Sequence, residues 1–342
     1  MPASIADVAK LARVSISTVS RVINRRQVVN EKTRQRVESA IVKLGYQPNA
    51  FARGLMLKRS EIIGLVLPDL HGEFYSEIIR GANIQAHESG YALVVSSTRD
   101  DVDDGQSLLH AIRQRALLDG VAVMVSELTD RVQEALGELR VPFVVLDDDI
   151  AGPPHDSVVI DQKDGALALM RHLVRRGGAR RVYFVGGLET NVDTIARRAA
   201  WREVLADAGL PADDGDAFHL DYQYETAYRL ARERVREWAR PGHVVFAAND
   251  EMAAGIVAAA NEAGVGVPRD LAVVGFDDTR IARMTRPALT TVRVPMSEMG
   301  AKAVELLCLR IADPKRPAER IALQPTLIVR ESCGVLASAA AR

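Results

Sequence analysis

The feature that most constrains the fold is an alternation of short apolar segments with amphipathic ones, which begins at Ile62. Continuous Val, Ile and Leu runs separated by helical segments are typical of parallel strands buried on both faces. The apolar segments occupy 62–68, 91–97, 120–126, 142–147 and 157–161, and the pattern begins again with 181–187, 217–221, 243–249, 271–278 and 289–295. The alternation therefore predicts an α/β fold of two lobes, each a doubly wound parallel sheet.

The two predicted lobes are joined by segments that cross between them. We expect lobe 1 to span about 62–160 plus 292–318, and lobe 2 to span about 162–290 plus 320–332. A helix over about 296–311 is assigned to the first lobe, and the strand "IALQPTLIVRES" to the second. The tail over 333–342 contains no leucine heptad, so no tetramerising coiled coil is expected and a dimer is predicted.

The net charge of −1 hides an unequal distribution along the chain. Of the 44 basic and 45 acidic side chains, twelve basic and three acidic ones lie in residues 1–60, so this segment carries +9 and the remainder −10. A basic segment attached to an acidic one favours contact between the basic segment and a polyanion. A solvated charged surface is the alternative, but it would not normally separate the two signs by domain.

Three short helices are expected in the basic segment. Ser4 opens the first with a capping box, Ser15 is the natural N-cap of the second, and Asn30 caps a third that Gly45 ends. The first two helices are joined by a short link around Arg13. Two helices joined in this way form a helix-turn-helix.

The second of these helices is built mainly from Ser, Thr, Val and Ile, which are poor helix formers. Val19, Val22 and Ile23 recur with helical spacing and predict a buried face. The opposite face carries Ile16, Ser17, Ser20, Arg21 and Asn24. Short hydroxyl side chains let a helix approach phosphates and bases closely, and an arginine can read guanine through two hydrogen bonds. The sequence thus predicts a helix that enters the major groove of DNA.

The segments "SIADVAKLARVSISTVSRVIN", "KTRQRV" and "LGYQPNAFARGL" closely resemble the N-terminal signature of LacI/GalR-type bacterial transcription regulators. The resemblance implies a helix-turn-helix DNA-binding domain over 1–47, with bases read by Ile16, Ser17 and Arg21. It also implies phosphate contacts from Ser4, Ser15, Thr18, Ser20, Asn24, Asn30 and Thr33. The chain departs from the family at Arg13, where the turn usually has Gly.

A hinge helix is implied over 48–60. Asn49 can cap a helix of only two turns, and Gly54 inside it costs up to about 1 kcal/mol relative to Ala. Because so short a helix is marginal in water, we expect it to form on DNA. By resemblance, Asn49, Ala52 and Leu55 approach the minor groove, with Leu55 as a wedge between bases. A plain linker is the alternative.

The segments "FAANDEMAAGIVAA" and "LAVVGFDD" resemble the effector-binding core of the same family, which is similar to periplasmic binding proteins, so the resemblance runs from residue 3 to 332. In open α/β sheets, ligands bind at the carboxyl ends of strands. Effector contacts are implied for Tyr75, Asp147, Arg197, Tyr222, Asn249 and Asp277. Polar residues that follow predicted strands, such as Asp278, can instead cap helices. Met124 and Val294 replace residues that are often polar, and Arg197 with few acids nearby would also suit a sugar acid.

These features predict a homodimeric repressor of carbohydrate-related genes with no cofactor and no metal. Its partners would be a pseudo-palindromic double-stranded DNA operator and a small sugar-like effector. The effector would bind to a core over 61–332, which would also form the dimer. Two cysteines and no apolar segment of signal or membrane length indicate a cytoplasmic protein. The common nucleotide, hydrolase and zinc motifs do not occur, so no enzyme is expected. The alternatives are a periplasmic-type sugar-binding protein without DNA function and a regulator that responds to a protein partner.

Overall fold

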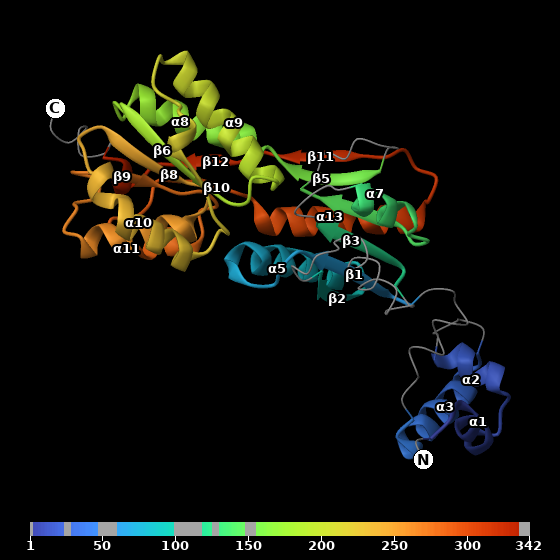
Figure 1. Cartoon of the computed structure of the whole chain (residues 1–342). Coiled ribbons are helices and arrows are strands. Elements are labelled where there is room, and N and C mark those ends of the chain that lie inside the picture. The colour runs from blue at the N-terminus through green and yellow to red at the C-terminus, as the bar shows by residue number, and fades with distance from the viewer. Residues whose placement is uncertain are drawn as a thin grey trace. The chain divides into compact units, whose positions relative to one another are not determined.

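The computed structural model describes residues 3–23, 29–46, 60–98, 118–124, 130–147 and 155–334 (Figure 1). The packing of the chain divides it into two units, Met1–Glu61 and Ile62–Arg342, each with a hydrophobic core of its own. Among the residues described, none of the helices combines the length and the apolar character that crossing a membrane requires.

In the described part of the first unit, three helices pack around a small core, as predicted. They are α1 (Ile5–Ala12), α2 (Ile16–Ile23) and α3 (Glu31–Leu44). Val8, Val19 and Val37, one from each helix, are fully buried and form the centre of this core. Because α2 consists of poor helix formers, its stability depends on this packing rather than on its own propensity.

The predicted helix caps of this unit are present. The backbone N of Asp7 donates to Ser4 Oγ at 3.3 Å, and the backbone N of Ser4 donates to the Asp7 carboxylate at 2.9 Å, which completes a capping box. The side chain of Asn30 accepts from the backbone N of Lys32 at 2.9 Å. Gly45 ends α3 with a left-handed φ of 58°.

The first lobe of the second unit is a six-stranded parallel sheet with the order β11-β5-β4-β3-β1-β2. Its strands are β1 (Ile62–Leu67), β2 (Ala92–Ser97), β3 (Gly120–Met124), β4 (Phe143–Leu146), β5 (Asp156–Ile160) and β11 (Arg320–Leu323). Its helices are α5 (Gly72–Glu88), α7 (Asp130–Gly137) and α13 (Met296–Ala312). Successive side chains of a strand point to opposite faces, so Leu65 and Val144 belong to one core cluster, while Val66 and Val145 pack with α7 in another. Both faces of the sheet are therefore buried, as the continuous apolar runs predicted.

The second lobe contains a four-stranded parallel sheet with the order β7-β6-β8-β9 (Figure 1). Its strands are β6 (Arg181–Gly186), β7 (Ala217–His219), β8 (His243–Ala247) and β9 (Ala272–Val274). Its helices are α8 (Gln162–Arg175), α9 (Val192–Asp207), α10 (Tyr224–Trp238), α11 (Asp250–Glu262) and α12 (Arg280–Met284). Short 3-10 turns lie at Asp214–Asp216 and Glu331–Cys333. Helices α8 and α9 pack as one pair, and α10 and α11 as another.

The structure corrects the prediction of a single strand over 321–332 in the second lobe. The segment forms two strands: β11 pairs with β5 in the sheet of the first lobe, and β12 (Thr326–Ile328) pairs antiparallel with β10 (Thr291–Arg293). Pro325 lies between β11 and β12 and has no backbone N–H to donate, which ends the first ladder at this point. The chain thus crosses between the lobes inside the segment that was expected to belong to one of them.

Two glycines bring the backbones of α5 and α13 into close contact. A Cβ atom added at Gly81 would lie 1.8 Å from the carbonyl oxygen of Ser297, and one added at Gly300 would lie 2.0 Å from that of Ile78. No side chain fits at either position, so each helix uses a glycine where it crosses the other. This crossing fixes α5, whose first turn reaches the carboxyl end of the first sheet.

Replacement of Gly300 by Ala should test this crossing. Alanine is the better helix former by about 1 kcal/mol, yet the added methyl group must displace the Ile78 carbonyl. We expect Gly300→Ala to destabilise the full-length protein by about 1–3 kcal/mol in urea unfolding. Gly137→Ala is the matched control, because a Cβ at this helical position meets nothing within 4 Å. Equal stability of the two variants would contradict a crossing held by glycine.

Candidate functional site

The exposed face of α2 carries the residues predicted to read bases. Ile16 is 51% exposed despite its large apolar side chain, and Ser17 and Arg21 are also exposed. On the other face, Val19 and Val22 are buried. An exposed aliphatic side chain beside hydroxyl groups and an arginine suits the major groove, where a thymine methyl group and guanine acceptors are available. The structure therefore presents the three predicted side chains together on one accessible surface.

A cluster of hydroxyl groups lies at the start of α2. Ser15 Oγ is 2.8 Å from Ser17 Oγ and 2.9 Å from Thr18 Oγ1, and it accepts from the backbone N of Thr18 at 3.2 Å. Ser15 thus caps the helix, as predicted. Donor groups at a helix N-terminus favour binding of a phosphate, which is the contact predicted for Ser15 and Thr18.

The remaining predicted phosphate contacts lie at other places in this unit. Ser4 and Asn30 cap α1 and α3, Ser20 lies half-buried on α2, and Thr33 Oγ1 accepts from Arg36 Nη2 at 3.5 Å. Their contacts to DNA stay predictions. Four further candidates lie outside the described residues: Asn24, Asn49, Ala52 and Leu55.

The turn between α1 and α2 has the backbone conformation that a glycine would adopt. Arg13 ends α1 with a φ of 54°, in the left-handed region, and the backbone N of Val14 donates to the carbonyl of Ala9 at 3.0 Å. A left-handed residue other than Gly costs roughly 1–2 kcal/mol. The departure at Arg13 therefore keeps the geometry of the turn and adds an exposed cation beside α2.

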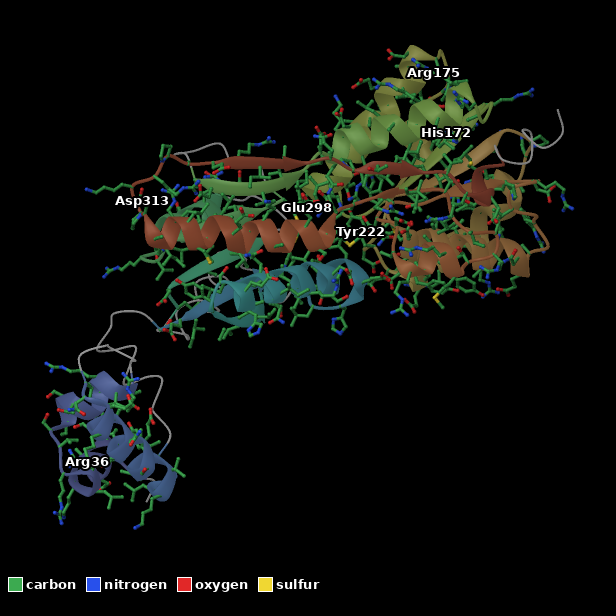
Figure 2. The ribbon with its side chains drawn as sticks, turned by 180° about the vertical axis from the view of Figure 1, so that it is seen from behind. Arg36, His172, Arg175, Tyr222, Glu298 and Asp313 are labelled. Atoms are coloured by element: carbon green, nitrogen blue, oxygen red, sulfur yellow. The ribbon has the colours of Figure 1, made fainter. Side chains whose placement is uncertain are left out.

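A cavity of about 480 Å³ lies between the lobes of the second unit. All six predicted effector residues line it: Tyr75, Asp147, Arg197, Tyr222, Asn249 and Asp277. Four of these come from the segments that directly follow β4, β7, β8 and β9. The carboxyl ends of parallel strands are the usual ligand-binding edge of an open α/β sheet. Figure 2 labels Tyr222 at the junction of the two lobes.

Arg197 is the most tightly held of these side chains and is only 2% exposed. Its Nη1 donates to the carbonyl of Ala248 at 2.6 Å, and its Nη2 donates to Gln162 Oε1 at 2.8 Å. The guanidinium also lies over the ring of Phe276, with Cζ 4.1 Å from the ring centroid. Its Nε has no hydrogen-bond partner within the described part of the chain. The group is fixed in orientation and still has a donor to offer.

Three carboxyl groups surround this guanidinium. Arg197 Nη2 lies 3.2 Å from Asp193 Oδ2 and 3.9 Å from Asp277 Oδ1, and the positive charge also acts on Asp147. Burial raises the pKa of Asp277 to about 7 against the opposing effect of Arg197. Burial and the neighbouring Asp193 raise the pKa of Asp147 well above its usual range. The expectation that Arg197 has few acids nearby is wrong. Asp147 and Asp277 are far from Arg197 in the sequence and approach it only in the fold, whereas Asp193 lies four residues before it on α9.

The Tyr222 hydroxyl donates to Asn191 Oδ1 at 2.9 Å and lies 2.6 Å from Thr194 Oγ1. Burial raises the pKa of Tyr222, so this phenol is neutral at physiological pH. Asn249 caps α11 by accepting from the backbone N of Met252 at 2.8 Å, and its Nδ2 donates to the Tyr222 carbonyl at 2.9 Å. One N–H of the Asn249 amide is left over by these contacts.

Three residues of the cavity have left-handed backbones although none is glycine. The φ angles are 60° at Asp147, 65° at Tyr222 and 105° at Asp277. Each such residue costs about 1–3 kcal/mol, and such conformations persist where a site requires them. Their occurrence around one cavity is typical of a functional site.

Two family models match the chain: bacterial regulatory proteins, lacI family, over residues 4–49, and periplasmic binding protein-like domain over residues 170–333. The HTH-type transcriptional repressor PurR of Klebsiella pneumoniae is 34% identical over 332 residues, which are 96% of this chain and 96% of that protein. The chain belongs to the lacI family of bacterial regulatory proteins. It is therefore a DNA-binding transcription regulator, and the predicted family and fold class are confirmed.

Two solved structures of transcription regulators resemble this chain over nearly its whole length. The Lac repressor dimer bound to operator and the anti-inducer ONPF has a TM-score of 0.86 and 27% identity, and the match covers 97% of this chain and 99% of that one. The complex of the regulator CelR with cellobiose has a TM-score of 0.72 and 30% identity, and covers 96% of this chain and 99% of that one.

The lining of the cavity differs from the lining predicted from the sequence at Val294, Asn191 and Asp193. Met124 lines the cavity, as predicted. Val294 is not among the described residues that line it, because its side chain is buried in the core. Asp193 and Asn191 also line the cavity, although the sequence patterns did not predict them as cavity residues. The signal for Asp193 was its position four residues before Arg197, which places both on one face of a helix. Asn191 is the N-cap of α9, and this role concealed it among ordinary capping residues.

The buried state of Asp277 should appear in the pH dependence of stability. A carboxyl whose pKa rises from its usual value to about 7 on folding stabilises the protein below the unfolded pKa, and this contribution is lost as the pH rises through 7. Between about pH 4.5 and 7.5, the free energy of unfolding of the wild type should fall by up to about 3 kcal/mol more than that of Asp277→Asn.

Urea unfolding of full-length protein at several pH values measures this difference. Asp207→Asn, at an exposed position on α9, is the control and should keep the pH dependence of the wild type. Parallel pH profiles for the wild type and Asp277→Asn would contradict the assignment.

Proposed function

We propose that the protein is a homodimeric repressor of carbohydrate-related genes, and that a sugar-like effector in the cavity between its lobes changes its affinity for operator DNA. The observation that carries the proposal is the convergence of all six predicted effector residues on one cavity, in a chain that also has an exposed recognition helix. The names of the relatives support it. PurR is a transcriptional repressor, CelR was solved with cellobiose, and the Lac repressor was solved as a dimer on operator.

In this proposal, Ile16, Ser17 and Arg21 read bases in the major groove. Phosphates are held by Ser4, Ser15, Thr18, Ser20, Asn24, Asn30 and Thr33. Exposure of the three base-reading side chains and the capping positions of Ser4, Ser15 and Asn30 support these roles. Two copies of the unit would read the half-sites of a pseudo-palindrome.

The effector signal would reach DNA through the hinge. Asn49, Ala52 and Leu55 are proposed to contact the minor groove, with Leu55 as the wedge. A change in the arrangement of the lobes would separate the two hinges of a dimer and melt their helices. The coupling must be reciprocal, so an effector that weakens operator binding is itself bound more weakly on operator, by the same factor.

We assign the DNA-binding domain to 1–47, the hinge to 48–60, the effector-binding core to 61–332 and the tail to 333–342. Since its target is DNA, the protein is proposed to act in the cytoplasm. No catalytic turnover is proposed, since the relatives named above are regulators.

Binding to DNA is tested by fluorescence anisotropy with a labelled duplex from the region upstream of the gene. We expect tight binding to this duplex, weak binding to a scrambled one, and a steep loss of affinity with salt, because bound cationic side chains release counterions. Addition of an effector should then change the affinity for the native duplex. Equal, salt-insensitive binding to both duplexes would contradict sequence-specific recognition.

Arg21 should supply most of the direct base discrimination, because Ile16 and Ser17 offer few hydrogen bonds. Arg21→Ala is expected to relax specificity at one base pair by about 1–3 kcal/mol, measured as the ratio of affinities for operators that differ at that pair. Lys43→Ala is the control, since Lys43 is an exposed cation in the last turn of α3. A uniform loss across all operators would assign Arg21 to phosphate binding instead.

A further inference from the structure

The wall of the effector cavity is strongly acidic. The carboxyl groups that line it belong to Asp69, Glu73, Asp147, Asp193, Asp221, Glu251 and Asp277. Within the described part of the chain, its only basic lining residues are Arg197 and His71. His71 already lies beside a carboxylate, with Nδ1 2.9 Å from Asp69 Oδ1. A cavity with walls of one sign attracts and concentrates ligands of the opposite sign.

The most buried side chains of the cavity wall include more acidic than basic groups. Asp147, Asp193 and Asp277 are three carboxyl groups close to a single guanidinium, that of Arg197. Burial raises the pKa of all three carboxyl groups. Three buried carboxyl groups around one guanidinium favour a ligand that supplies further positive charge.

Two acceptor atoms of these carboxyl groups have no donor in the part of the chain that the structure describes. Asp193 Oδ1 and Asp277 Oδ1 are buried and lack a hydrogen-bond partner among the described residues, and the Asp277 side chain is only 8% exposed. Buried polar atoms normally find partners, so a pair of unpartnered acceptors in a cavity indicates a ligand that brings donors. An ammonium group brings three donors and a positive charge together, whereas a hydroxyl group brings one donor and no charge.

We propose that the effector is a polyhydroxylated ligand that also carries an ammonium group, which binds between Asp193 and Asp277 beside Asp147. The inference rests on the proposed effector function and narrows its ligand to an amine-bearing sugar or a close relative. Tyr75, Met124 and Leu188 supply apolar surface for the ring. Anionic ligands such as sugar acids and sugar phosphates are disfavoured, because they would add to the negative charge of the wall.

The test is isothermal titration calorimetry of the full-length protein with matched sets of sugars. Each set contains a hexosamine, its parent hexose, its N-acetyl derivative and the corresponding uronate, in the gluco, galacto and manno configurations. In the set whose configuration fits, the hexosamine should bind about tenfold or more tightly than the hexose and the N-acetyl derivative. The uronate should bind most weakly.

A substitution locates the ammonium group. Asp193→Asn removes a charge but keeps the shape of the side chain, and should reduce the preference for the hexosamine over its parent hexose to about threefold or less. Asp207→Asn, on the same helix but exposed, should keep the preference of the wild type. The selectivity of the wild type is a separate measurement, so the proposal stays falsifiable even where Asp193→Asn fails to fold.

The outcomes separate this inference from the proposed function. Parent hexoses that bind as tightly as their amines, or hexosamines that fail to bind at about 10 mM, overturn the ammonium site. A neutral sugar that binds tightest and shifts operator affinity overturns it too, but leaves the effector-controlled repressor intact. A hexosamine that binds selectively without changing operator affinity supports the site and contradicts the proposed coupling to DNA.

Discussion

The buried guanidinium of Arg197 is the interaction on which the arrangement of the cavity depends. One face of the guanidinium packs on the ring of Phe276, and its Nη1 donates to the carbonyl of Ala248. Gln162 accepts from Arg197 at 2.8 Å and donates to Asp147 Oδ2 at 3.4 Å, so a chain of hydrogen bonds runs from the second lobe to the first. A ligand that binds Arg197 or Asp147 is therefore linked through these hydrogen bonds to both lobes.

The mouth of the cavity is also bridged. Glu73, in the first turn of α5, accepts from the backbone N of Arg280 at 2.8 Å, although the two residues belong to different lobes. Because α5 is packed backbone to backbone on α13 through Gly81 and Gly300, a displacement of its first turn cannot be absorbed by side chains at the crossing. Helix α5, whose first turn lines the cavity, is thus packed rigidly against α13. Such a rigid pair can transmit a small change at the cavity across the lobe.

Local patterns predicted more of this protein than long-range contacts did. Runs of Val and Ile located the strands, and single residues such as Ser15 and Asn30 located helix starts, because these signals act within a few positions of the chain. The sequence predicted Asp147 and Asp277 as cavity residues but not that they lie beside Arg197, because those contacts form only in the fold. Asp193 lies one helical turn before Arg197 and was the one acid that local spacing could have indicated. Asp277 and Asp278 show the limit most clearly: they are adjacent strand-end acids, yet only Asp277 lines the cavity. Asp278 binds Arg293 and Arg330 instead, and the difference lies in backbone angles that the sequence does not reveal.

The cavity is costly to the folded protein when it holds no ligand. Left-handed backbones at Asp147, Tyr222 and Asp277, together with carboxyl groups pushed toward neutrality by burial, all reduce stability at neutral pH. These conformations persist because packing in the surrounding apolar core stabilises them by more than they cost. A ligand that donates to the unpartnered oxygens of Asp193 and Asp277 recovers part of this cost. A ligand that contacts these oxygens of the second lobe and Asp147 of the first lobe binds best in one arrangement of the lobes. This difference between arrangements is what a regulator needs in order to switch.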